Sequence, residues 1–140
     1  MKTALVDTNI LSMFFRGHPQ VVAEFEAYLQ EYDTINLSII TYYEIVSGLK
    51  HRDARNQLNL FLEFAAQNTI LPFTQKVADV AAELYADLRK SGQPIDDIDL
   101  LIAGTAIANG LIMVTDNRKH FDRIAQLEVE NWAEAKGATL

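Results

Sequence analysis

The chain has 140 residues, of which 49% are hydrophobic, and its formal net charge is −7 at pH 7. This length suits a single core, so we expect one domain over residues 1–140, and the composition argues against a disordered chain. Broad, nonspecific binding to nucleic acid usually needs a basic surface, so the charge disfavours it. A local nucleic-acid site remains compatible with the charge if cations neutralise some of the carboxylates.

The chain has no cysteine and only three histidines. Disulfides and thiolate metal sites are therefore excluded, and a metal site would be built mainly from oxygen ligands, which favours Mg²⁺, Mn²⁺ or Ca²⁺ over Zn²⁺. No apolar stretch approaches the roughly 20 residues that span a membrane, and no signal peptide is visible. We therefore expect a cytoplasmic protein without a membrane partner.

Strand and helix patterns alternate along the chain, without repeats or a linker. Short apolar runs predict strands, apolar residues at helical spacing predict helices, and glycine or proline marks several breaks between them. In chain order we predict a strand at 3–6, helices at 10–15 and 20–32, a strand at 34–38, helices at 39–50 and 52–67, a strand at 69–73, helices at 76–90 and 97–109, and strands at 111–115 and 127–131.

Strands that are separated by helices pair in parallel through crossover connections. We therefore predict an α/β fold, a three-layer α/β/α sandwich with a central parallel sheet of four to five strands. Ligands of such sheets bind beyond the carboxyl ends of the strands. Asp7 and Asp116 directly follow the predicted strands at 3–6 and 111–115, where a site is expected.

Two further acids interrupt apolar helices. Glu44 lies within the predicted helix 39–50, and Asp99 shares a helical face with the small apolar residues Ile102, Ala103 and Ala106. An unpaired carboxylate on a buried face is costly, and a divalent cation is one reason to keep it ionised. Four convergent acids could hold two ions, which activate water and stabilise both oxygens in a phosphoryl displacement.

Each acid also has an ordinary structural interpretation. Asp7, with Thr8, could cap the first helix, and Asp96, Asp97 and Asp116 all precede predicted helices, where aspartate is a common cap. For Asp97 we prefer the cap interpretation. Glu44 taken alone could be a surface residue. The joint pattern of acids carries more weight than any single member.

Four stretches occur in this order: "LVDTNIL", "LSIITYYEIVSGL", "DIDLLIAGTAIANGLIMVTDN" and the "HF" at 120–121. With these motifs the chain resembles the PIN-domain ribonucleases, in particular the VapC-type toxins of bacterial toxin–antitoxin pairs. The resemblance implies a Mg²⁺- or Mn²⁺-dependent endoribonuclease whose metal is bound by Asp7, Glu44 and Asp99. The family's fourth acid falls on Asn117 here, and Asp116 lies immediately before it, so Asp116, Asn117 or neither could complete the catalytic set.

Polar residues at family positions are expected to support the acids, and they are Thr8, Asn9, Ser38, Thr115 and Asn117; each could equally be a turn or cap residue. For RNA phosphates the candidates are Lys50, Arg52 and Arg118, against the alternative of solvated basic residues. The three histidines are scattered in sequence, so no histidine base is proposed. Trp132 is expected in the core or an interface.

The resemblance further implies hydrolysis that leaves a 5′-phosphate and a 3′-hydroxyl, with transfer RNA or ribosomal RNA as substrate. It implies a VapB-like antitoxin as partner, whose segment occupies the acidic groove, and a homodimer. Three competing interpretations remain. A haloacid-dehalogenase-like phosphatase would need a second aspartate that "VDTN" lacks, a response-regulator receiver would need an aspartate after the third strand, and a catalytically silent PIN-fold binding module would not cleave RNA.

Overall fold

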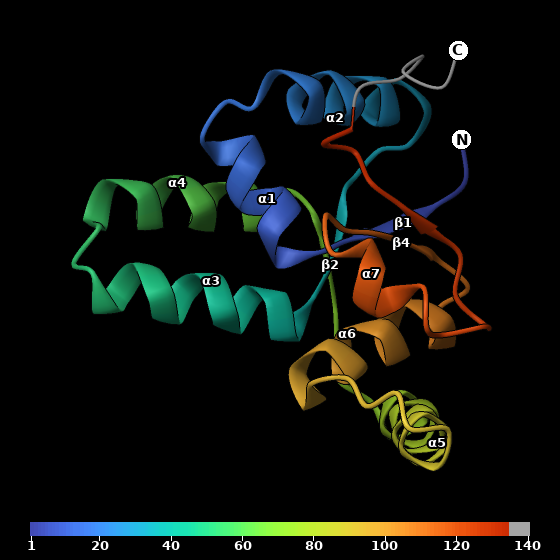
Figure 1. The fold of residues 1–140 in the computed structure, drawn as a ribbon. Coiled ribbons are helices and arrows are strands. Elements are labelled where there is room, and N and C mark those ends of the chain that lie inside the picture. The colour runs from blue at the N-terminus through green and yellow to red at the C-terminus, as the bar shows by residue number, and fades with distance from the viewer. Residues whose placement is uncertain (135–140) are drawn as a thin grey trace.

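The computed structural model describes residues 1–134, which form a five-stranded parallel sheet with helices on both faces (Figure 1). The strand order is β3-β2-β1-β4-β5, and every pair is parallel. The strands are β1 (Ala4–Val6), β2 (Asn36–Ser38), β3 (Thr69–Leu71), β4 (Ile112–Val114) and β5 (Val129–Glu130). The predicted α/β fold with a parallel sheet of up to five strands is confirmed.

Seven helices cover the sheet within the described residues, and they are α1 (Thr8–Phe15), α2 (Pro19–Glu31), α3 (Ile39–His51), α4 (Arg55–Ala66), α5 (Gln75–Lys90), α6 (Asp97–Ala108) and α7 (Arg118–Phe121). The buried side chains of α1 to α4 form one hydrophobic cluster and those of α5, α6 and α7 form another. The sheet lies between these two clusters, which gives the predicted three layers.

The side chains of a strand point alternately to the two faces of the sheet, which explains the two clusters. Ala4 and Val6 belong to the cluster of α1 to α4, whereas Leu5 between them belongs to the cluster of α5 to α7. Successive side chains of a strand point to opposite faces of the sheet, so a short run that is buried on both faces reads as continuously apolar. Strand β1 thus contributes apolar side chains to both clusters with only three residues.

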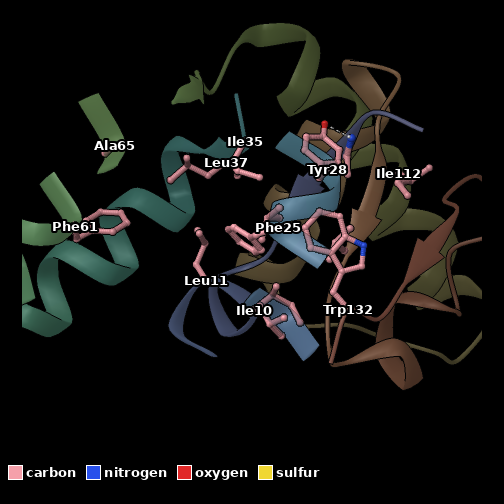
Figure 2. Packing of buried hydrophobic residues seen from close by; sticks show 14 of the residues in the cluster. Ile10, Leu11, Phe25, Tyr28, Ile35, Leu37, Phe61, Ala65, Ile112 and Trp132 are labelled. Atoms are coloured by element: carbon pink, nitrogen blue, oxygen red, sulfur yellow. Dashed lines mark hydrogen bonds between the residues drawn. The ribbon is translucent and has the colours of Figure 1, made fainter. Parts of the chain in front are cut away.

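Aromatic residues fill the larger cluster (Figure 2). The Phe14 and Phe25 rings stack with centroids 4.2 Å apart, and Trp132 meets Phe25 edge to face at 5.5 Å. The Tyr28 hydroxyl accepts a hydrogen bond from the Ala4 backbone N–H at 3.1 Å, which ties α2 to the start of β1. Trp132 is buried, as expected for a core residue.

The boundaries differ from the sequence-based ones in a few places. Helix α1 begins at Thr8, before the predicted Ile10, because Asp7 caps it. Strand β3 ends at Leu71, because Pro72 has no backbone N–H to donate to a neighbouring strand. Among residues 1–134, no helix combines the length and the apolar character that crossing a membrane requires.

Close packing of α5 against α6 predicts that Gly104→Ala destabilises the fold. A Cβ at Gly104 would lie 3.2 Å from the Val77 carbonyl oxygen and 3.3 Å from the Ala81 backbone nitrogen, and backbone atoms have little room to yield. We expect a loss of about 1–3 kcal/mol in the free energy of unfolding, measured with urea.

Gly48→Ala is the matched control, because a Cβ there would approach only the Arg52 guanidinium, at 3.9 Å. Alanine is the better helix former, so this variant should gain up to about 1 kcal/mol. Equal effects at the two glycines would contradict the packing of α5 on α6.

Candidate active site

The centre of the candidate site lies at the carboxyl ends of β1, the central strand, and its neighbour β4. Val6 pairs with Val114, so Asp7 and Thr115 follow side by side, and the Asp7 backbone N–H donates to the Val114 carbonyl at 2.8 Å. The Thr115 hydroxyl donates to Asp7 Oδ2, also at 2.8 Å. Both residues are buried. The sheet register thus fixes the Asp7 carboxylate at the bottom of the site.

Asp7 also caps α1, as its structural interpretation predicted. Its Oδ1 accepts a hydrogen bond from the Thr8 backbone N–H at 2.8 Å. Each carboxylate oxygen therefore has one donor from the protein and keeps further lone pairs. Capping and participation in the site are compatible roles for this residue.

Glu44 lies on α3 and contacts Thr8, the residue that follows Asp7. Ser38 caps α3 by accepting from the Thr41 backbone N–H at 2.9 Å, and Glu44 follows one turn later. The Thr8 hydroxyl donates to Glu44 Oε1 at 2.6 Å. Glu44 is partly buried and hydrogen-bonded, which does not favour its interpretation as a solvated surface residue.

Asp99 projects from the first turn of α6, and its side chain is 26% exposed. The apolar residues that share its face are buried, but the start of the helix lies at the open edge of the site, so Asp99 is less buried than the sequence pattern indicates. Burial is the main cause that raises the pKa of Asp99. Asp96 and Glu44 raise this pKa further, and His120 lowers it.

The cap of α6 corrects one prediction. Asp96, with extended backbone dihedrals, accepts from the Ile98 backbone N–H at 3.2 Å and is the capping residue. Asp97 is the first residue of the helix itself, so the cap interpretation of Asp97 is wrong.

The pKa of Asp7 is raised from 3.8 to about 6, mainly by burial and to a smaller extent by the negative charges of Asp99 and Glu44. The hydrogen bonds from Thr115 and from the Thr8 backbone act in the opposite direction and favour the ionised form. The three predicted metal-binding acids therefore share one electrostatic environment. Such mutual repulsion is what a bound cation relieves.

The donor set fits a hard divalent cation, since it consists of carboxylate and hydroxyl oxygens. Within residues 1–134, no three acidic or histidine side chains lie close enough together to form a complete ligand cluster. Mg²⁺ does not require one, because it is usually held by one or two carboxylates, with water and substrate phosphates completing the shell. Asp7, together with Glu44 or Asp99, can meet that requirement.

Asp116 and Asn117 take different places. Asp116 Oδ1 accepts from the exposed Asn9 side chain at 3.3 Å, and it does not cap α7. The Asn117 backbone N–H donates to the Thr115 hydroxyl at 3.0 Å, and its amide nitrogen lies 2.9 Å from His120 Nδ1. The structure thus places these two residues and Thr8, Asn9, Ser38 and Thr115 beside the acids or at the starts of helices, and their supporting role in the site stays a prediction.

His120 is a site residue that the sequence analysis did not select. Its Nδ1 lies 4.0 Å from Asp99 Oδ2, so an imidazole stands beside the carboxylate of α6. The scattered positions of the three histidines concealed this placement. The "HF" motif at 120–121, which the resemblance includes, was the available signal.

A pocket of about 370 Å³ adjoins the site between α1, α3 and α4. Thr8, Glu44 and Arg52 are among its lining residues, and Phe15 and Leu60 give it an exposed apolar wall. Among the predicted RNA-binding residues, Arg52 therefore lies at the site. Lys50 is exposed at the end of α3, and Arg118 forms an exposed ion pair with Asp122 at 3.7 Å.

Comparisons with known proteins agree on one family. The PIN-domain profile matches residues 4–127. Ribonuclease VapC2 of Rickettsia felis is 33% identical over 91% of this chain and 96% of that protein. The tRNA(fMet)-specific endonuclease VapC of Shigella flexneri is 28% identical over 92% of this chain and 97% of that protein.

Solved structures lead to the same result. VapBC2 of Rickettsia felis, bound to a DNA fragment from its promoter, aligns with a TM-score of 0.83 and 32% identity, over 92% of this chain and 98% of that chain. DNA-bound VapBC of Salmonella typhimurium aligns with a TM-score of 0.83 and 25% identity, over 94% of this chain and 99% of that chain. The resemblance seen in the sequence motifs is confirmed, and the chain belongs to the PIN-domain family, in its VapC-type branch.

Proposed function

We propose that the protein is a metal-dependent endoribonuclease that acts as the toxin of a toxin–antitoxin pair. The observation that carries the proposal is the Asp7 carboxylate, buried at the carboxyl end of the central strand and electrostatically coupled to Glu44 and Asp99. The relatives named as ribonucleases cover nearly the whole chain and support the same reaction. We place the protein in the cytoplasm, where such an RNA substrate is found.

Mg²⁺ or Mn²⁺ in such a site supplies an activated water and stabilises charge on the phosphate. Asp7 would hold the ion, with Asp99 as the second carboxylate and Glu44 binding directly or through water. Hydrogen bonds from Thr115 and from the Thr8 backbone favour the ionised form of Asp7 and orient its carboxylate. Hydrolysis of the phosphodiester by water leaves a 5′-phosphate on one product and a 3′-hydroxyl on the other.

The RNA substrate and the antitoxin would both bind at the pocket beside Glu44. Arg52 can hold an RNA phosphate near the acids, with Lys50 and Arg118 farther along the surface. The apolar wall and adjacent carboxylates fit a VapB-like antitoxin segment that combines apolar side chains with a basic one. Relatives of this chain were solved as VapBC complexes, which supports that partner. A homodimer remains our expectation.

Asn117 is expected to matter more than Asp116. Asn117→Ala removes the amide that contacts His120 beside Asp99, so we expect about a fivefold to tenfold loss of cleavage. Asp116→Asn keeps the oxygen that accepts from Asn9 and should change the rate by less than about threefold.

The measurement is the rate of RNA cleavage by Asn117→Ala and by Asp116→Asn, each at saturating Mg²⁺. A larger loss at Asp116 would make Asp116 the fourth acid of the site.

The proposed function is tested with purified, antitoxin-free protein and end-labelled total transfer RNA. Separate reactions contain Mg²⁺, Mn²⁺ or EDTA, and Asp99→Asn is run alongside. We expect discrete cleavage with metal and none with EDTA or in the variant, whose fold is checked by circular dichroism. Ribosomal RNA is the second substrate to be tried. Cleavage that survives in EDTA or in Asp99→Asn would contradict the proposal, and a folded protein that cleaves neither RNA would indicate a silent binding module.

A further inference from the structure

The Thr8 hydroxyl has one proton and two acceptors. It lies 2.6 Å from Glu44 Oε1 and 3.1 Å from Thr41 Oγ1, and it has donor geometry toward both. A hydroxyl donates only one hydrogen bond at a time. The short contact to the carboxylate is the stronger of the two, because hydrogen bonds to ionised acceptors are shorter and stronger. Thr41 is therefore an alternative acceptor for the Thr8 proton when Glu44 does not accept it.

The Thr41 side chain is more tightly enclosed than that of Glu44. The Thr41 side chain is fully buried, and its backbone N–H donates to the capping Ser38 hydroxyl, so its oxygen stays near Thr8. Glu44 follows three residues later on the same face of α3, and its longer side chain lines the open pocket. Glu44 has room to turn away from Thr8, and Thr41 does not.

We propose that Thr41 is a positioning residue that allows Glu44 to exchange its hydrogen bond with Thr8 for a place in the metal site. When Glu44 leaves, the Thr8 hydroxyl turns to Thr41 and its proton keeps an acceptor. Without Thr41 the same movement leaves a partly buried donor unpaired, which costs free energy and holds Glu44 on Thr8. This inference rests on the proposed function, since it assigns Glu44 a role toward the metal.

The test measures Mn²⁺ binding by electron paramagnetic resonance, with the full-length protein and Mn²⁺ alone. Thr41→Val keeps the shape of the side chain and removes the acceptor, and we expect Mn²⁺ to bind about threefold to tenfold more weakly. Thr41→Ser restores the hydroxyl and should bind as the wild type does. If Thr41→Val fails to fold, Thr41→Ala replaces it.

Two further variants separate positioning from a general structural effect. In a Thr8→Val background, Thr41→Val should have no additional effect, because the donor that Thr41 serves is absent. Thr105→Val removes an equally buried hydroxyl that donates to the Leu101 carbonyl within α6, and Mn²⁺ binding should not change.

Wild-type affinity in Thr41→Val, failure of serine to restore binding, or an undiminished effect in the Thr8→Val background would each overturn the inference. Absence of Mn²⁺ binding by the wild-type protein would also overturn it. Mn²⁺ binding with the expected pattern, but without RNA cleavage, would support the role of Thr41 and contradict the proposed ribonuclease, so the two failures are distinguishable.

Discussion

Asp7→Asn is expected to abolish RNA cleavage and, at the same time, to stabilise the metal-free protein at pH 7. Asparagine carries no charge to hold a cation, and metal ions contribute several kcal/mol of charge stabilisation to such reactions. A loss of that size corresponds to about a thousandfold in rate. The gain in stability has a separate origin, in the burial of the Asp7 carboxylate.

The direction of the stability change follows from the pKa of Asp7, which is raised from 3.8 to about 6 in the folded protein. Between these values the folded protein binds more protons than the unfolded chain, so stability falls as the pH rises through this range. Over that pH range, ionisation of Asp7 lowers the free energy of unfolding by at most about 3 kcal/mol. The asparagine amide cannot accept from both Thr8 and Thr115, which offsets about 1 kcal/mol. We expect a net gain of about 2 kcal/mol at pH 7.

Urea unfolding at several pH values measures this effect. The advantage of Asp7→Asn over the wild type should grow between pH 4 and pH 6 and stay constant above pH 7. Added Mg²⁺ should stabilise the wild type and leave the variant unchanged, because only the former binds it. Asp33→Asn, at an exposed position outside the site, is the control and should change stability by less than about 0.5 kcal/mol. A constant difference across the whole pH range would show that Asp7 does not titrate near 6.

The positions of the acids were predictable because they depend on periodicity. A short apolar run that ends in aspartate places Asp7 at the end of a strand, and parallel strands bring such ends to one edge of the sheet. The pairing of β1 with β4, which places Thr115 against Asp7, depends on contacts far apart in the chain. That pairing was not predicted from the sequence.

Other features depend on backbone conformation and on helix placement, which the residue types alone do not determine. In "DDID" either of the first two aspartates could cap a helix, and the dihedral angles of Asp96 decide the matter. His120 reaches Asp99 only because α7 follows β4 directly and lies over the start of α6. The pocket beside Glu44 likewise requires three helices in one arrangement. Long-range packing is the information that sequence periodicity lacks.

Thr115→Val is expected to weaken metal binding and cleavage by about 10- to 100-fold at pH 7, and to move the acid limb of the pH–rate profile to higher pH. The Thr115 hydroxyl donates to Asp7 Oδ2 and lowers the pKa of that carboxyl, so its loss raises this pKa further. Hydrogen bonds to charged groups contribute about 1.5–3 kcal/mol, which gives the expected range. Since a metal ion binds the ionised carboxylate, the variant loses activity at a higher pH than the wild type does.

The measurement is kcat/KM for RNA cleavage between pH 5 and pH 8, together with Mn²⁺ affinity at the same pH values. Thr115→Ser keeps the hydroxyl and should retain the wild-type midpoint. Asn117→Ala serves as the comparison, because it keeps the backbone N–H that donates to Thr115 and the Thr115–Asp7 hydrogen bond, and removes only the side-chain contact with His120. If Asn117→Ala moves the midpoint as far as Thr115→Val does, the effect comes from α7 and His120. If only Thr115→Val moves it, the ionisation of Asp7 controls metal binding.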